Sequence, residues 1–233
     1  MFSHRYEVRY GDYLDQHSIK PSSLLDMVQD VSSLHSAACG YDIGTLYDRG
    51  LCWILQGMTL RLLAPTDNQQ PVDACTAVAQ MKGITSERGC LLRQGDQVVA
   101  KTIANWVLFD VAAQKLARFP AGMAEAYGTH DFQDAFFRYH KPLPAETAPL
   151  WTVRIGRREI DTNRHLNNEK SAELLMDALP ADFAMGEMCI YYKRSAYEGD
   201  VLTLSRGEIE NGWYAALHFA DGGLCAAARF TAR

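Results

Sequence analysis

The chain has 233 residues, of which 48% are hydrophobic and 22% are charged, and its formal net charge is −5. This length accommodates one large domain or two small ones, and the apolar content is sufficient for a buried core. A mildly acidic chain is poorly suited to nucleic acid or to an anionic membrane surface, because both select a basic face.

Neither a targeting segment nor a metal or cofactor motif is visible in the sequence. The amino-terminal stretch, Met1 to Glu7, has no apolar region of the secretory kind, and no apolar run is long enough to span a bilayer. The six cysteines lack C-x-x-C spacing, which indicates free thiols in a reducing compartment. The histidines form no ligand cluster, and nucleotide-binding loops are lacking. We therefore expect a cytoplasmic protein with no metal, no cofactor and no nucleic-acid or membrane partner.

The first half of the chain predicts a strand, a long helix and four antiparallel strands. The first strand is expected at Tyr6 to Tyr13. A helix start follows at Ser18 to Ser23, which contains Pro21, and apolar residues then recur at spacings of three and four until Gly40 stops the helix. After an irregular stretch at 42–50, strands are expected at 51–63, 72–82, 90–93 and 98–109, with a hairpin turn at 94–97.

The second half repeats this order. Prolines and glycines between about 119 and 150 predict a linker, with a short helix near 131–139. Val153 to Gly156 then resembles Val8 to Gly11, about 145 residues earlier. A helix is expected at 168–178, strands at 188–194, 201–209, 213–219 and 224–231, and hairpin turns at 211–212 and 221–223. A repeated order of elements implies two copies of one α+β fold, in which a twisted antiparallel sheet curls around an apolar helix.

A polar motif precedes the second helix: Asp161-Thr162-Asn163-Arg164-His165-Leu166-Asn167-Asn168. Asp161, Asn163 and His165 alternate, so an extended strand would direct all three side chains to one face. Capping and turn formation are the alternative for such a stretch, most of all for Asn167 and Asn168.

The motif, with Glu169 and Lys170 after it, resembles the D-x-N-x-H-(V/L)-N-N-x-K signature of the acyl-acyl-carrier-protein thioesterases of plants and bacteria. Similar segments run through the first half in the expected order: 6–9, 19–29, 50–55, 106–110 and 116–120. The resemblance implies a double hot-dog fold, two antiparallel sheets each wrapped around a long helix. The expected divisions are an N-terminal hot-dog domain at 1–120, a linker at 121–150 and a catalytic hot-dog domain at 151–233.

The implied activity is hydrolysis of fatty acyl-acyl-carrier protein to free fatty acid and carrier protein, within fatty acid biosynthesis. Thioester hydrolysis needs a base or nucleophile, a proton carrier and donors for the developing oxyanion. We assign Asp161 as base or nucleophile, Asn163 as the group that positions water or the carbonyl, and His165 as proton carrier or polariser. The division of roles between Asp161 and His165 stays open. Asn167 and Asn168, near free N–H groups at the helix start, are assigned to substrate binding.

The first copy lacks this constellation, because Gln16 and Ser18 occupy the places of Asn163 and His165 when the halves are offset by about 147 residues. We expect one active site per chain and an acyl-binding role for the first half. The candidate walls of the acyl tunnel are Trp53 with its strand and Leu24, Met27, Val28 and Val31, for which ordinary core packing is the alternative.

The expected partner is an acyl carrier protein with a phosphopantetheine-linked acyl chain. Because carrier proteins are acidic, basic residues near the motif are candidate contacts, Arg157 and Arg158 above all. The other basic residues there are Arg154, Arg164, Lys170, Lys193 and Arg194. The fold closes within one chain, and further association to a homodimer is an open alternative.

One departure from the family pattern concerns Ser195 and Ala196, which occupy the places where the family often has a Glu-Cys pair. Glu198 falls in an expected turn, and Cys189 reads as a buried small residue. Three other functions therefore stay open. They are an acyl-CoA thioesterase, a hot-dog dehydratase of 3-hydroxyacyl thioesters, which would not need Asn163, and a non-catalytic acyl-thioester binding protein.

Overall fold

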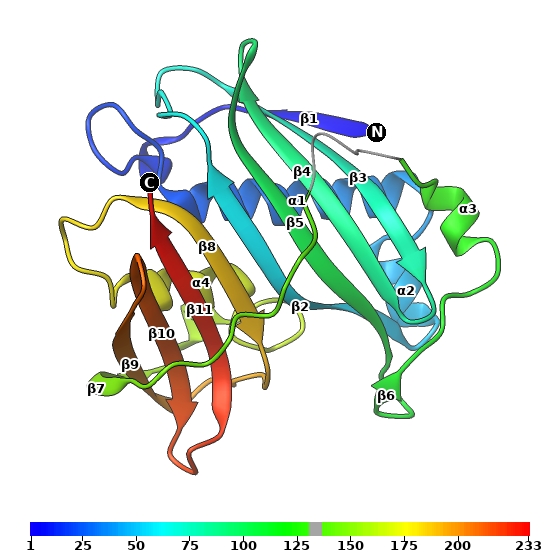
Figure 1. Cartoon of the computed structure of the whole chain (residues 1–233). Coiled ribbons are helices and arrows are strands. Elements are labelled where there is room, and N and C mark those ends of the chain that lie inside the picture. Colours follow the sequence, from blue (N-terminus) through cyan, green and yellow to red (C-terminus); the bar gives the residue numbers. More distant parts are fainter. Residues whose placement is uncertain (131–136) are drawn as a thin grey trace. The chain divides into compact units, whose positions relative to one another are not determined.

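The computed structural model describes residues 1–130 and 137–233 and comprises two compact units, Met1–Tyr139 and His140–Arg233 (Figure 1). The strands of each unit pair antiparallel and are accompanied by helices, so the predicted α+β class is confirmed, whereas the two separately wrapped sheets of a double hot-dog fold stay a prediction. Within the described ranges, no helix is long and apolar enough to cross a membrane. The short helix expected near 131–139 falls largely on 131–136, outside the described residues.

The sheet of the first unit confirms the four antiparallel strands expected after the helix. The tight turn predicted at 94–97 is present, and Gly95 adopts a φ of 57°, which glycine tolerates without a steric penalty. In spatial order the strands are β1 (Phe2–Tyr6), β3 (Val72–Lys82), β4 (Thr85–Gln94), β5 (Gln97–Asp110) and β2 (Leu51–Leu62), with β6 (Lys115–Leu116) paired to β5.

The predicted long helix is α1 (Pro21–Ala38), which crosses one face of this sheet and packs against β3 and β1 (Figure 1). Pro21 occupies the first turn, and Gly40, with a φ of 78°, ends the helix as expected. The apolar stripe is fully packed, because Leu24, Leu25, Met27, Val28 and Val31 are each at most 5% exposed. Burial of each such side chain contributes about 1.5–3 kcal/mol.

Two local predictions in this unit are wrong. The strand expected at Tyr6 to Tyr13 lies earlier, at β1, because the Arg9 N–H donates to Asp12 Oδ2 at 2.8 Å and closes a 3-10 turn, η1 (Tyr10–Asp12). The stretch expected to be irregular contains α2 (Ile43–Asp48), which Asp42 caps through the N–H of Thr45.

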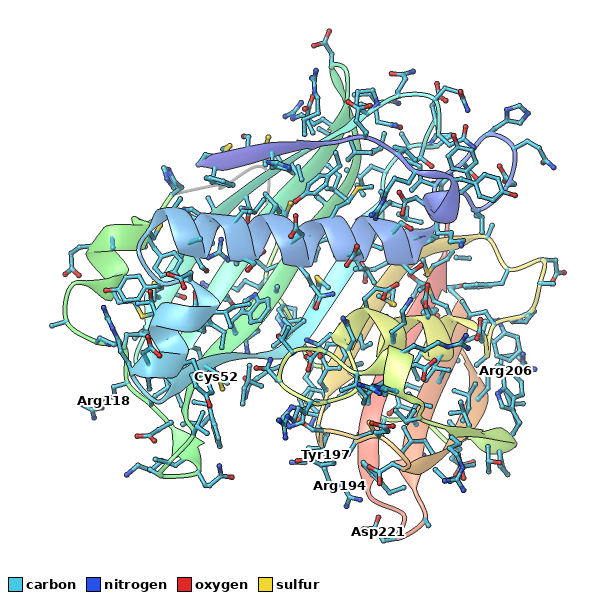
Figure 2. All side chains as sticks on the ribbon, turned by 180° about the vertical axis from the view of Figure 1, so that it is seen from behind. Cys52, Arg118, Arg194, Tyr197, Arg206 and Asp221 are labelled. Atoms are coloured by element: carbon cyan, nitrogen blue, oxygen red, sulfur yellow. The ribbon has the colours of Figure 1, made fainter. Side chains whose placement is uncertain are left out.

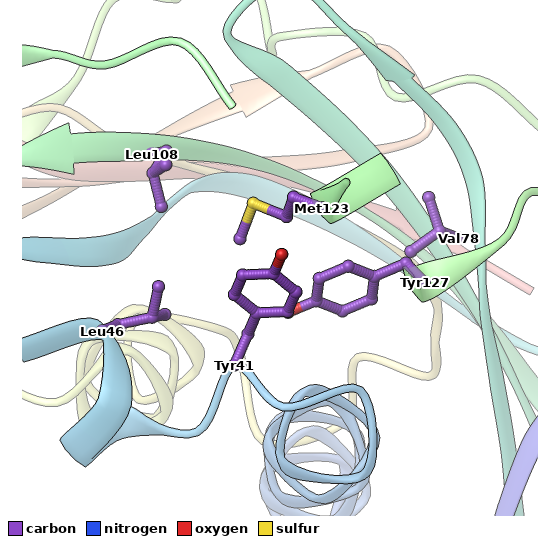
Figure 3. Packing of buried hydrophobic residues seen from close by; sticks show 6 residues of the cluster. All are labelled: Tyr41, Leu46, Val78, Leu108, Met123 and Tyr127. Carbon is purple, nitrogen blue, oxygen red and sulfur yellow. The ribbon is translucent and has the colours of Figure 1, made fainter. Parts of the chain in front are cut away.

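Part of the expected linker packs into the first unit. Residues 123–127 form α3 (Met123–Tyr127), and both end residues of this helix are buried. They join an aromatic and aliphatic cluster at the carboxyl end of α1 (Figure 3). The other members of that cluster are Tyr41, Leu46, Val78 and Leu108.

The second unit confirms the predicted helix and strands, with one correction. Its helix α4 (Asn168–Met176) has nine residues, so it is half the length of α1 and not the long helix that was expected. It packs against β10 and β11, and its residues Ala172 and Leu175 are buried. In spatial order the strands are β8 (Met185–Tyr192), β11 (Leu224–Ala232), β10 (Gly212–Phe219), β9 (Val201–Ile209) and β7 (Ala148–Arg154).

The loops before the helices of the two units share a 3-10 turn and a backbone bridge. In the second unit the Gly156 N–H donates to Glu159 Oε2 at 2.7 Å and closes the 3-10 turn η2 (Arg157–Glu159), as Asp12 does for η1. A single antiparallel bridge then joins Tyr13 to Ile19 in one loop and Ile160 to Leu166 in the other. These bridges lie 147 positions apart at both ends, 160 minus 13 and 166 minus 19. The internal repeat is therefore visible in backbone hydrogen bonding as well as in the order of elements.

Candidate active site

The motif residues form a closed turn, so the extended strand expected for Asp161, Asn163 and His165 is wrong. Asp161 Oδ1 accepts the backbone N–H groups of Asn163 at 2.8 Å and His165 at 3.1 Å. The Asp161 N–H in turn donates to the His165 carbonyl at 2.8 Å. A short carboxylate that bonds to nearby backbone amides stabilises a turn at the expense of an extended chain.

Arg164 completes this turn in an unusual conformation. Its φ is 63°, in the left-handed region, and its N–H donates to the Asp161 carbonyl at 3.0 Å. A residue with a long side chain reaches that region at a cost of about 1 kcal/mol. Asn163 and Arg164 are both exposed at the tip of the turn. The Asn163 side chain is therefore exposed to solvent, whereas the Asp161 carboxylate accepts hydrogen bonds from backbone amides of the turn.

His165 is half-buried and its imidazole is set against an aromatic ring. The ring of Tyr197 meets it edge to face, with centroids 5.1 Å apart and an angle of 84° (Figure 2 labels Tyr197). The adjoining loop is joined to the motif by the Leu166 N–H, which donates to the Ala196 carbonyl at 2.8 Å. Backbone and ring contacts therefore fix the position of the His165 side chain while leaving it accessible.

Asn167 and Asn168 have structural roles in the helix start. Asn167 Oδ1 accepts the N–H of Glu169 at 2.8 Å and caps α4. The Asn168 carbonyl accepts a hydrogen bond from the Tyr192 hydroxyl at 2.9 Å. The Asn167 side chain therefore has the capping role that was the alternative to substrate binding. Substrate binding by Asn167 and Asn168 stays a prediction.

Glu169 was not anticipated as a site residue. The residue is 8% exposed, although it lies in the first turn of α4 directly after the motif. The nearest cation, Lys170, lies 3.2 Å from its carboxylate but makes a shorter contact of 2.8 Å with Glu173. Burial, followed by the charge of Glu173, raises the pKa of Glu169 to about 7. The signal available in the sequence was the like-charged ladder of Glu169, Glu173 and Asp177 at four-residue spacing.

The basic residues near the motif differ in their ion-pair partners. Arg157 and Arg158 are exposed at η2, and Arg158 pairs with Glu159 at 2.7 Å. That hydrogen bond lowers the pKa of Glu159, against an opposing effect of burial. Arg194 pairs with Asp221 at 2.8 Å and its guanidinium lies 3.5 Å from the centroid of the Phe219 ring (Figure 2 labels Arg194 and Asp221).

The remaining candidates of the second unit differ in their exposure to solvent. Ser195 and Glu198 are exposed, whereas Ala196 is 1% exposed. Cys189 was expected to be buried but is partly exposed, and its thiol donates to the His140 carbonyl at 3.0 Å. In the part of the chain that the structure describes, no group of three or more metal-binding side chains gathers.

Trp53 belongs to the first unit. Its ring lies 5.7 Å from that of Phe119 and 6.3 Å from that of Tyr127, so it packs against the buried aromatic cluster. The expected tunnel-wall residues of α1 are all buried in the same unit. These facts fit both an acyl-binding wall and an ordinary core.

Solved structures define the class of fold. An acyl-ACP thioesterase from Bacteroides thetaiotaomicron VPI-5482 is 16% identical, with a TM-score of 0.87 over 99% of this chain and 97% of its own. The 12:0-ACP thioesterase from Umbellularia californica is 14% identical, with a TM-score of 0.85 over 100% of this chain and 96% of its own. At these identities the likeness establishes the fold, which is α+β and hot-dog-like.

The sequence establishes the family. The family model described as acyl-ACP thioesterase N-terminal domain matches residues 1–127, more than half of the chain. The chain therefore belongs to the acyl-ACP thioesterase family, and the resemblance to that family is confirmed. No curated protein matches it by sequence.

Proposed function

We propose that the chain is a hydrolase that cleaves fatty acyl thioesters of acyl carrier protein, releasing free fatty acid and the carrier thiol. The observation that carries this proposal is the His165 imidazole, held by the closed motif turn and the Tyr197 ring in a member of a thioesterase family. An imidazole whose ordinary pKa lies near neutrality can take up and return a proton at physiological pH.

In the proposed reaction, the motif residues transfer a proton, orient the water or the carbonyl, and position the turn. A water oxygen bonds to the thioester carbon, and one water proton passes to His165. The carbon–sulfur bond then breaks, and the proton returns from His165 to the leaving sulfur. The exposed Asn163 amide orients the water or the carbonyl, and Asp161 fixes the turn that carries both side chains.

The first unit takes the acyl chain in this proposal, as a hot-dog domain in tandem with a catalytic one. Its apolar interior and Trp53 supply the surface, and its motif loop carries Gln16 and Ser18 in place of Asn163 and His165. An amide and a hydroxyl do not replace an imidazole as proton carrier at neutral pH. One reactive site per chain follows.

A thiol-release assay tests the proposal. Purified protein is incubated with a panel of acyl-carrier thioesters and the matching CoA thioesters, beside His165→Ala. We expect release from carrier thioesters and a loss of at least about hundredfold in His165→Ala. His17→Ala, an exposed histidine in the equivalent loop of the first unit, is the control and should keep full activity. Full activity in His165→Ala contradicts the assignment, and enoyl product in place of free thiol identifies a dehydratase.

A further inference from the structure

Arg88 is a buried cation with no carboxylate partner among the described residues. It lies on β4 and is 6% exposed, and within the described chain its guanidinium donates to one acceptor, His35 Nδ1, at 2.7 Å. The guanidinium carbon also lies 5.5 Å from the centroid of the Tyr127 ring (Figure 3 labels Tyr127). A guanidinium has five N–H donors, and burying a charge is costly unless acceptors surround it. Most of the donor capacity of Arg88 is therefore not taken up by the described residues.

Two polar groups on the neighbouring strand β5 are buried without a hydrogen-bond partner. They are Thr102 Oγ1 and Trp106 Nε1, which bond to none of the residues that the structure describes. Thr102 is 0% exposed. Buried polar groups in proteins are nearly always paired, because an unpaired donor keeps the full cost of losing water. These two groups therefore mark a place where a bound molecule can complete the hydrogen bonding.

The three side chains share one face of the sheet. Arg88 pairs with Ala104 in register, and Thr102 and Trp106 lie two positions before and after Ala104 on β5. Residues opposite one another, and those two positions along, point to the same face, with diagonal neighbours about 7–8 Å apart and within reach of a long side chain. The bond from Arg88 to His35 of α1 identifies this as the helix-facing side. We call Arg88, Thr102 and Trp106 the donor patch.

The chemistry of the donor patch favours an acceptor oxygen over an alkyl chain. Arg88 and Trp106 can only donate, and the Thr102 hydroxyl can rotate to donate. Methylene groups placed against them would leave these donors unpaired, whereas a hydroxyl, oxo or carboxylate oxygen would accept from them. A site with buried hydrogen-bonding groups rejects analogues that lack the matching oxygen. The donor patch is therefore expected to select an oxygenated ligand.

We propose that the first unit binds acyl chains that carry an oxygen function away from the thioester, and that Arg88, Thr102 and Trp106 donate hydrogen bonds to that oxygen. This inference rests on the proposed function, which assigns the acyl chain to the first unit. It narrows the substrate class to hydroxyacyl, oxoacyl or carboxyacyl thioesters, in preference to unsubstituted fatty acyl thioesters.

Binding to the full chain tests this preference without relying on hydrolysis. The probes are amide analogues of acyl-pantetheine, in which nitrogen replaces the thioester sulfur. Isothermal titration calorimetry compares dodecanoyl and hexadecanoyl analogues with those bearing a hydroxyl or oxo group at each position from mid-chain to the end, or a terminal carboxylate. We expect at least one oxygenated analogue to bind at least about tenfold more tightly than the plain analogue of the same length. Equal or weaker binding of every oxygenated analogue overturns the inference.

Three substitutions connect the preference to the donor patch. Thr102→Val keeps the shape of the side chain but removes the hydroxyl, and Trp106→Phe removes the indole N–H. Each should reduce the preference for the oxygenated analogue by about fivefold, and Arg88→Met should abolish it. An unchanged preference in both Thr102→Val and Trp106→Phe overturns the inference, whether or not Arg88→Met folds.

Thr76→Val is the matched control for Thr102→Val. Thr76 is also 0% exposed, but its hydroxyl donates to the Gly89 carbonyl at 2.9 Å. Thr76→Val should lower the urea midpoint, whereas Thr102→Val should not, because it removes a hydroxyl without a partner. Equal destabilisation would mean that the Thr102 hydroxyl is already bonded, which overturns the inference. Absence of thiol release from every thioester refutes the proposed function instead, whereas thiol release with no preference for oxygenated analogues refutes this inference alone.

Discussion

Asp161 and His165 are bonded to each other twice within one turn. The Asp161 carboxylate accepts the His165 N–H at 3.1 Å, and the Asp161 N–H donates to the His165 carbonyl at 2.8 Å. The Asp161 carboxylate therefore fixes the backbone of His165, and this role does not require contact with the substrate.

Replacing Asp161 separates its structural role from a chemical one. Asp161→Asn retains an oxygen that can accept both backbone amides, so we expect stability close to wild type and activity within about tenfold. Asp161→Ala loses both bonds, which should cost about 1–2 kcal/mol of unfolding free energy and at least about hundredfold in kcat. Denaturant unfolding and thiol release measure the two effects. A folded Asp161→Asn chain as inactive as Asp161→Ala would show that the carboxylate takes part in the chemistry.

The helix caps of the two units should respond differently to alanine. Asn167 caps α4 through its side chain, whereas Lys20, at the same place before α1, makes no side-chain cap. Asn167→Ala is therefore expected to lower the unfolding free energy by about 1 kcal/mol, and Lys20→Ala by clearly less. Urea unfolding of both variants measures this difference. Equal losses would mean that the Asn167 side chain contributes little to the helix.

A buried histidine in the first unit should make stability fall in acid. His35 Nδ1 lies 2.7 Å from Arg88 Nη1, and burial followed by the Arg88 charge lowers the pKa of His35 from 6.5 to about 4. Between these values the unfolded chain binds a proton that the folded chain does not. Stability from this group is thus complete above pH 6.5 and declines toward pH 4, with a loss of about 2 kcal/mol by pH 5.

Comparison with His35→Gln isolates that effect, because the glutamine oxygen can accept from Arg88 but does not titrate. Urea unfolding at pH 7 and pH 5 should show a smaller acid loss in the variant than in the wild type. His17→Ala, at an exposed position, should retain the wild-type loss. The same acid loss in all three proteins would exclude His35 as its source.

Charge reversal at η2 tests whether this surface binds an acyl carrier protein. Arg157 and Arg158 are exposed, so an acidic carrier protein can reach them. Replacing both by Glu should raise KM for carrier-bound substrate by about tenfold and leave a short synthetic thioester unaffected. Lys115→Glu, on the exposed strand β6, serves as control. Equal effects on both substrates would indicate damage to the site, since Arg158 also pairs with Glu159.

The sequence predicted elements well wherever a long periodic pattern decides the structure. The stripe of α1 and the strands β3 and β9 lie where their patterns placed them. Prediction failed where one side chain bonds to the nearby backbone. Asp12 turned an alternating stretch into η1, and Asp161 turned an expected strand into a closed loop. A pattern of alternating polar and apolar residues predicts a strand, but it does not account for a carboxylate that binds the backbone amides in place of a neighbouring strand.

The candidate site was only partly predictable for the same reason. Asp161, Asn163 and His165 lie within one turn and not on the expected strand, and their side chains have unequal access to solvent. Glu169 escaped notice because a charged residue in a first helical turn is ordinarily solvated. Its burial depends on packing that no local pattern encodes.

The repeated loop has a consequence for engineering. The Leu14 N–H donates to the Ser18 carbonyl at 2.9 Å, as the Asp161 N–H does to that of His165 at 2.8 Å, so the two loops share this closing hydrogen bond although their side chains differ. This closing hydrogen bond therefore does not depend on which polar side chains the loop carries. Installing Asp, Asn and His at positions 14, 16 and 18 would leave the bridge between Tyr13 and Ile19 unaltered. We expect these three substitutions to place a second set of the motif side chains on the loop of the first unit, which has the same closing hydrogen bond.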